Sequence, residues 1–197
     1  MTMKKQAPKR SLLSDRRGIA ATEFAMIAPA LIFLVMGVLE MSFRFRASEE
    51  ATRYVHQVAD LVSREDELTT VQLGKIYGAA PFMMKPLETT ENLDLDIASI
   101  GFEDDEPKYF WRRVAGEPIE FQLERATGMG LEGETVIRVG VRYTYESILS
   151  NLFGGKIMTI EREAFARPRV ERVVTMDGEN EDGGEITYFG PGQVSTS

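Results

Sequence analysis

The apolar run from Phe24 to Leu39 most constrains what this chain can become, because none of its 16 side chains is charged or strongly polar. With Ile19 to Glu23 added, the segment has 21 residues and would form a helix about 31 Å long at 1.5 Å per residue. That length matches the hydrocarbon core of a bilayer. A buried helix of a globular protein normally keeps a polar face, and this segment lacks one. The pattern therefore predicts a membrane-inserted helix.

The charges on the two sides of this run are unequal. Residues 1–17 hold six Lys and Arg residues and one Asp, a local charge of +5, whereas the whole chain carries −8. The more basic flank of a membrane helix stays in the cytoplasm, so Arg16 and Arg17 are expected to orient the helix and to leave the acidic remainder outside. A cleaved secretory signal would need small residues at −1 and −3 beyond the run, and residues 39–47 offer no such pair.

Glu23 stands out because a carboxylate in the first turns of a membrane helix is costly. In one interpretation it lies among the lipid headgroups and stays hydrated. In the other it needs a counter-charge, which cleavage after Gly18 would supply as the new α-amino group of Ile19. In a side-by-side assembly of helices, the carboxylate of one subunit would then neutralise the amine of its neighbour at low dielectric.

Composition excludes several classes of chemistry. The chain has no cysteine and a single histidine, which rules out disulfides, thiolate metal sites, Cys nucleophiles and multi-His metal sites. His56 is expected at a surface or interface, and no Gly-x-Ser-x-Gly elbow is present. The acidic run over 177–185 lacks the sixth-position Gly of a calcium loop; residues 103–106 predict an exposed loop, whose calcium binding stays open. We expect no enzyme, cofactor, metal site or nucleic-acid partner.

Beyond the apolar run, the hydrophobic period indicates an α+β fold. Apolar residues recur at spacings of three and four from Phe43 to Val62, which predicts that the helix continues to about Arg64. Asp66-Glu67-Leu68 is expected to open a second helix that stops near Pro81. Alternating patterns then predict four strands of a small antiparallel sheet that packs against the long helix. These strands cover Leu93–Ala98, Tyr109–Val114, Thr135–Tyr145 and Ile157–Ala166, with a short helix over Ser147–Phe153 and a disordered tail from Met176.

The junction before the apolar run resembles a known processing signal. Arg16-Arg17-Gly18, followed by Ile19 to Phe24 and an apolar helix, is similar to the leader of type IV prepilins. In that family a membrane aspartyl peptidase cuts after the glycine, on the cytoplasmic side. Ile27-Ala28-Pro29 within the helix and Glu40 just past it resemble the TadE-like pseudopilins of the tight-adherence (Tad, Flp-type) pilus machinery.

Three later motifs extend this resemblance in the same order. They are Tyr109-Phe110-Trp111-Arg112-Arg113, Val141-Arg142-Tyr143-Thr144-Tyr145 and Arg167-Pro168-Arg169. Two departures stand beside them: Glu146 occupies a position that is often Pro in the family, and Ile19 replaces the usual first Phe of classical pilins. N-methylation of residue 19 therefore stays open.

The resemblance implies a pilin-like protein that is a minor pseudopilin without catalytic activity. It would be processed at Gly18–Ile19 by a prepilin peptidase, use Glu23 and Phe24 in assembly, and act in the initiation or support of pilus assembly, adherence and biofilm formation. Its partners would be the peptidase, other pilins and pseudopilins, the inner-membrane assembly platform and the lipid bilayer. It would be a single-pass inner-membrane protein with its N-terminus in the cytoplasm and its head in the periplasm, and entry into the fibre stays open.

The expected segments are a prepilin leader over 1–18, the transmembrane half of the helix over 19–41, its amphipathic extension over 42–64, a periplasmic head over 65–175 and an acidic tail over 176–197. The alternative is an unprocessed single-pass anchor that displays a periplasmic binding module. For that alternative, Gly18→Ala would leave function intact and a soluble fragment over 65–175 would work alone.

Overall fold

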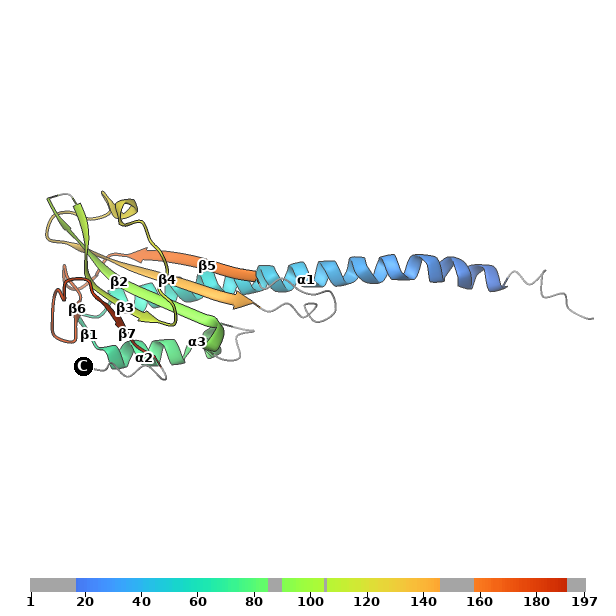
Figure 1. Cartoon of the computed structure of the whole chain (residues 1–197), viewed down its shortest axis with the longest axis horizontal. Helices are drawn as coiled ribbons and strands as arrows, with labels where there is room; N and C mark the ends of the chain where they lie inside the picture. Colours follow the sequence, from blue (N-terminus) through green and yellow to red (C-terminus); the bar gives the residue numbers. More distant parts are fainter. Residues whose placement is uncertain (1–16, 85–89, 105, 146–157, 191–197) are drawn as a thin grey trace, which may run out of the picture. The chain divides into compact units, whose positions relative to one another are not determined.

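The computed structural model describes residues 17–84, 90–104, 106–145 and 158–190 (Figure 1). The chain divides into two compact units, Met1–Ser42 and Phe43–Ser197, and each is described by itself. The predicted helix over 147–153 and the leader residues 1–16, Arg16 among them, lie outside the described residues.

Helix α1 runs from Arg17 to Ser63 as one element of 47 residues, which confirms the predicted long N-terminal helix. Its portion in the first unit is almost entirely exposed. Its portion in the second unit buries a regular stripe, because apolar residues at helical spacing fall on one face. The fully buried members of this stripe are Ala47, Ala51, Tyr54, Val55, Val58, Ala59 and Val62.

The second unit is built on a five-stranded sheet with the order β5-β4-β2-β3-β7. Its long strands are β2 (Leu93–Glu103), β3 (Glu106–Ala115), β4 (Thr135–Tyr145) and β5 (Met158–Ala166), and neighbours among them pair antiparallel. The fifth strand, β7 (Ile186–Tyr188), pairs parallel to β3. The four predicted strands are confirmed, and the parallel edge strand is an addition that the sequence pattern did not predict.

One face of the sheet forms the main core with the buried stripe of α1. Ile137, Val139 and Val141 point to this face from alternate positions of β4 and are fully buried. Trp111 of β3 joins them, and its indole Nε1 donates to the carbonyl oxygen of Val174 at 2.8 Å. The alternation read from the sequence therefore assigns the apolar face of β4 correctly.

The second helix begins later than predicted. Glu67–Leu68 form strand β1, which pairs parallel with β6 (Thr175–Met176), and helix α2 spans Thr70–Gly78. Thr69 caps α2 in a capping box with Gln72, which satisfies backbone N–H groups that the helix leaves unpaired. Helix α2 ends at Gly78, near Pro81 as predicted. Pro81 itself lies in the first turn of helix α3 (Ala80–Met83), where a missing N–H costs nothing. Short 3-10 turns η2 (Thr90–Asn92) and η3 (Leu123–Ala126) complete the elements.

The predicted disordered tail is wrong for residues 176–190. The carboxylate of Asp182 lies 2.5 Å from Nη1 of Arg113, and Asp177 accepts from the backbone N and the hydroxyl of Thr70 at 3.0 and 2.6 Å. Gly184 has φ 71°, and a Cβ there would lie 2.6 Å from Cβ of Tyr109, so only glycine lets the segment approach β3 this closely. Ion pairs and close backbone contact order a segment whose composition alone favours solvent; residues 191–197 lie outside the described part.

The second face of the sheet carries the polar positions of the alternating strands and is covered by the connection over 116–134. Asp96 and Arg138 are at most 1% exposed beneath it. Arg112 donates to both carboxylate oxygens of Asp96 at 3.1 and 2.5 Å, and the backbone N of Ile119 donates to the same group at 3.0 Å. Nη1 of Arg138 lies 3.7 Å from Asp96, and its guanidinium carbon lies 4.4 Å from the ring centre of Phe121. Burial lowers the pKa of Arg138 from its ordinary value.

Asp96→Ala should reduce the free energy of unfolding by about 3 kcal/mol or more, because Arg112 loses its carboxylate partner and the buried Arg138 loses one of its two acidic neighbours, Asp96 and Glu163. Chemical denaturation of the full chain in detergent, followed by the fluorescence of the single tryptophan, Trp111, measures the change. Glu103→Ala on the same strand is the matched control, since its ion pair with Lys108 is exposed and worth little. Equal stability of the two variants would contradict a structural role for the buried cluster.

Candidate functional site

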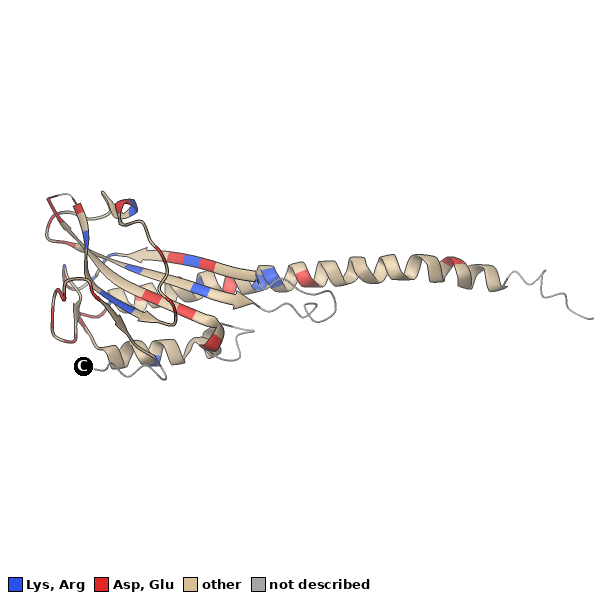
Figure 2. Ribbon diagram, in the orientation of Figure 1, with Lys and Arg blue, Asp and Glu red and all other residues tan. Residues whose placement is uncertain are grey.

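The N-terminal part of α1, from Gly18 to Met41, presents an apolar surface on all sides. Its two acidic residues are Glu23 and Glu40, and Figure 2 shows no charged residue on the helix between them. Twelve large apolar side chains here are at least half exposed, and full burial of that many would be worth on the order of 20 kcal/mol. They are Ile19, Phe24, Met26, Ile27, Leu31, Ile32, Phe33, Leu34, Val35, Val38, Leu39 and Met41.

This surface suits a bilayer better than water. Within the described residues, α1 is the one helix long and apolar enough to cross a membrane. Pro29 lies inside it and removes one backbone donor, so the carbonyl of Ala25 loses its helical hydrogen bond. Membrane helices tolerate such a proline where neighbouring helices or side chains satisfy the carbonyl.

The predicted processing site lies in the first turn of α1. The helix begins at Arg17, and both Gly18 and Ile19 are exposed. The first N–H groups of a helix have no intrahelical acceptor, so unwinding the first turn around the Gly18–Ile19 peptide bond breaks few hydrogen bonds. No atom lies within 4 Å of the position that a Cβ on Gly18 would take. Packing within the chain therefore does not account for the glycine.

The predicted assembly residues lie just beyond this turn. Glu23 is exposed, and Phe24 is 67% exposed. Residues 19 and 23 are four apart and so share one helix face, where the hydroxyl of Thr22 also donates to the Ile19 carbonyl at 2.8 Å. No Lys or Arg of the described residues pairs with Glu23. Residues 19 and 23 therefore lie on one face of α1, and the Glu23 carboxylate is available to another molecule.

Comparison with known families decides what this helix resembles. The model of the family described as TadE-like protein matches residues 18–60. The N-terminal helix is TadE-like. The match confirms the TadE-like resemblance for the helix and suggests an association with a Tad pilus. No curated protein and no solved structure gave a significant match.

The sequence pattern did not predict that charged residues of the head are buried in ion pairs. The alternate polar positions on β2 and β4 include the buried pair Asp96 and Arg138, and alternation alone does not indicate this burial. Across the described ranges no group of three or more His, Asp or Glu residues is placed to hold a metal ion, and His56 lies exposed on α1. Arg167 and Arg169 stand out in the sequence only as parts of the Arg-Pro-Arg motif.

Phe33→Arg should weaken membrane insertion, because an arginine at the centre of a membrane helix costs about 2.5 to 3.5 kcal/mol. The measurement is the fraction of full-length protein that resists alkaline extraction from membranes. Phe82→Arg is the matched control: Phe82 is 84% exposed and belongs to α3 of the second unit, so its variant should stay in the membrane fraction. Release of neither variant, or of both, would contradict insertion through this segment.

Proposed function

We propose that this chain is a minor pseudopilin of a Tad (type IVc, Flp) pilus system. It would be cut after Gly18 by a prepilin peptidase and would act in the initiation or support of pilus assembly, adherence and biofilm formation. The observation that carries the proposal is the exposed apolar half of α1, which begins at residue 18, where the TadE-like match also begins.

The local structure at Gly18 supports cleavage at this bond. A glycine inside a helix costs about 1 kcal/mol relative to alanine, and neither a positive φ nor a crowded Cβ position requires one here. A peptidase whose binding pocket accepts no Cβ would explain the residue. The exposed first turn also gives such an enzyme access from the basic, cytoplasmic side.

The position of Glu23 supports pairing between subunits. A carboxylate at the edge of the hydrocarbon core needs a positive partner, and the described residues supply none. Cleavage would create an amine on residue 19 of every subunit. Lateral association would then pair each carboxylate with a neighbouring amine, while the apolar side chains around them, Phe24 included, pack against one another.

The flanking charges support an orientation with the N-terminus in the cytoplasm. The six basic residues before the apolar run exceed those shortly after it, which are Arg44, Arg46 and Arg53. The positive-inside rule then puts the second unit in the periplasm. A chain without cysteine would have to remain folded there by packing and ion pairs alone.

Gly18→Ala should abolish processing, so that the protein keeps its basic leader. Sequencing of the protein N-terminus, in cells with and without a prepilin peptidase, measures this directly. The expected start in cells with the peptidase is Ile19 for the native chain. Gly37→Ala is the matched control, because Gly37 also lies in α1 with no atom near its Cβ position, and its processing should be unchanged.

Two results would contradict processing at this bond, and a third would contradict its functional role. A native chain that begins at Met1 in the presence of the peptidase, or near residue 48, would exclude cleavage after Gly18. Normal function of an unprocessed Gly18→Ala protein would favour the single-pass anchor that displays a binding module.

Glu23→Ala should leave processing intact and lower assembly about tenfold or more, because the amine of the neighbouring subunit would lose its counter-charge in a medium of low dielectric. The readouts are the N-terminal sequence and the fraction of cells that carry pili. Glu49→Ala removes an exposed acid from the second-unit part of the same helix and should affect neither. Unchanged piliation with Glu23→Ala would contradict the pairing.

A further inference from the structure

A strap of six residues, 167–172, crosses the second unit with its backbone fixed at both ends. The N–H of Arg169 donates to the carbonyl of Ser63, the last residue of α1, at 2.9 Å. At the other end, the carbonyl of Arg172 accepts from the backbone N and the hydroxyl of Thr135 at 3.0 and 3.1 Å. Because Thr135 begins β4, the strap joins the end of the helix to the start of a central strand and holds its side chains on a rigid platform.

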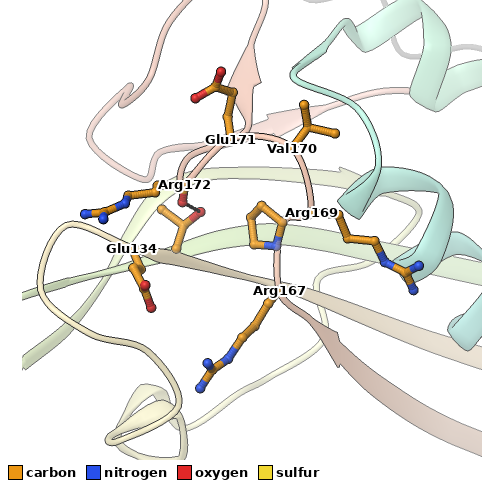
Figure 3. Close-up of a pocket in the computed structure, with 8 residues that line it drawn as sticks. Glu134, Arg167, Arg169, Val170, Glu171 and Arg172 are labelled. Carbon is orange, nitrogen blue, oxygen red and sulfur yellow. Dashed lines mark hydrogen bonds between the residues drawn. The ribbon is translucent and has the colours of Figure 1, made fainter.

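The strap lies between two hollows of the surface. One, of ≈ 240 Å³, is lined by the strap and by Glu134 and Thr135 (Figure 3). The other, of ≈ 350 Å³, lies against α1 and includes His56 and Asp60. Arg167 and Arg169 line both hollows, so the two adjoin along the strap and both belong to the second unit. We call this pair of hollows the groove.

The arginines of this groove are paired differently from those of the sheet. Arg112, Arg113 and Arg142 each lie within 4 Å of a carboxylate. In the strap, Arg169 contacts Asp60 at 2.6 Å, and Arg167 donates only to the carbonyl of Met129, at 2.7 Å.

Arg172 has no side-chain partner among the described residues, and neither Arg172 nor Arg167 pairs with a carboxylate there. The chain has 31 acidic against 23 basic residues, so unpaired guanidinium groups in it are not explained by a shortage of acids. Figure 3 shows both side chains projecting away from Arg169, toward the side where Glu134 lies.

The mixed charge of the groove limits what can bind. Glu134, Glu171 and Asp60 also line it, and they would repel a uniform polyanion such as nucleic acid or an anionic membrane surface. An arginine fork fits single carboxylates with two parallel hydrogen bonds. Val170, which is 62% exposed between the arginines, offers an apolar contact. These features fit a polypeptide in which acidic and apolar side chains alternate.

The neighbouring strand extends the same surface. β5 ends at Ala166, directly before the strap, and it is an edge strand of the sheet among the described strands. An edge strand presents unpaired backbone groups to which an extended segment can add. A second copy of β5 is a poor occupant, since antiparallel pairing about its centre sets Arg162 opposite Arg162 and Glu161 opposite Glu163, and like charges in such positions destabilise.

We propose that the groove along residues 167–172 is a docking surface for an extended acidic segment of another protein. Arg167 and Arg172 bind its carboxylates, Val170 contacts an apolar side chain of the same segment, and the edge of β5 accepts the continuing backbone. This surface does not depend on cleavage after Gly18 or on the assembly role of Glu23.

The test uses full-length protein in detergent micelles and a fluorescent peptide of alternating Glu and Val. Fluorescence anisotropy should detect binding, and Arg167→Ala/Arg172→Ala should weaken it about tenfold or more through loss of two charge-assisted contacts. Arg46→Ala/Arg53→Ala, which removes two exposed arginines of α1 outside the groove, should bind as the native protein does. Arg167→Glu/Arg172→Glu should lose this peptide and bind one of alternating Lys and Val.

Several outcomes would overturn the proposal. These are no binding by the native protein, equal binding by the alanine variant and the native protein, or binding of anionic lipid vesicles through these arginines in place of the peptide. Self-association that the alanine variant abolishes would make a second copy the occupant and would overturn it too. Arg172→Ala alone controls for a folding defect of the double variant, because that side chain contacts no partner in the described structure. This single variant should fold normally and still bind the peptide more weakly than the native protein.

Discussion

The fold depends on helix α1, whose first part is exposed and whose second part packs against the sheet. In its first part, α1 exposes large apolar side chains in every direction, which water does not support. In its second part, small and β-branched residues such as Ala51, Val55 and Val58 form a single buried stripe against the sheet. Alanines in this stripe let the sheet approach closely, while Tyr54 fills the space near α2 and donates to the carbonyl of Ile76 at 3.3 Å. The same element therefore serves as a candidate membrane anchor and as half of the head core.

Buried ion pairs hold segments of the head together, and the chain has no cysteine that could form a disulfide there. Asp96 lies at the centre of the covered face, where Arg112 and the backbone of Ile119 satisfy its oxygens. Arg113 performs a related role on β3 by binding Asp182 of the C-terminal segment. These pairs connect segments far apart in the sequence, so they hold the connection over 116–134 and the last strand onto the sheet. A chain with excess acid gains from this arrangement, because its carboxylates are neutralised where they are buried.

Much of this architecture follows from periodicity alone. The bounds of β4, Thr135 and Tyr145, coincide with the prediction, because a strict alternation of apolar and polar residues has few other solutions. The start of α2 was predicted too early, since the cap at Thr69 outweighed the acidic residues before it. The C-terminal segment was misjudged for a different reason: its Gly and acidic residues favour solvent, and only its contacts with Arg113 and Tyr109 make it part of the fold. For the candidate site, the basic flank, the glycine and the apolar run were all visible in the sequence.

By itself the sequence determined the long apolar helix, the strand positions and the TadE-like N-terminal segment, because each depends on a local pattern of residue types. The tertiary structure alone decided which charges are buried together and which remain available. Asp96 and Arg138 look like surface residues of their strands until the covering connection removes water from them. Arg167 and Arg172 look like any other arginines until the fold sets them on a strap where neither pairs with a carboxylate of the described residues. Pairing across long sequence separations depends on the packing of several elements at once, which no local pattern specifies.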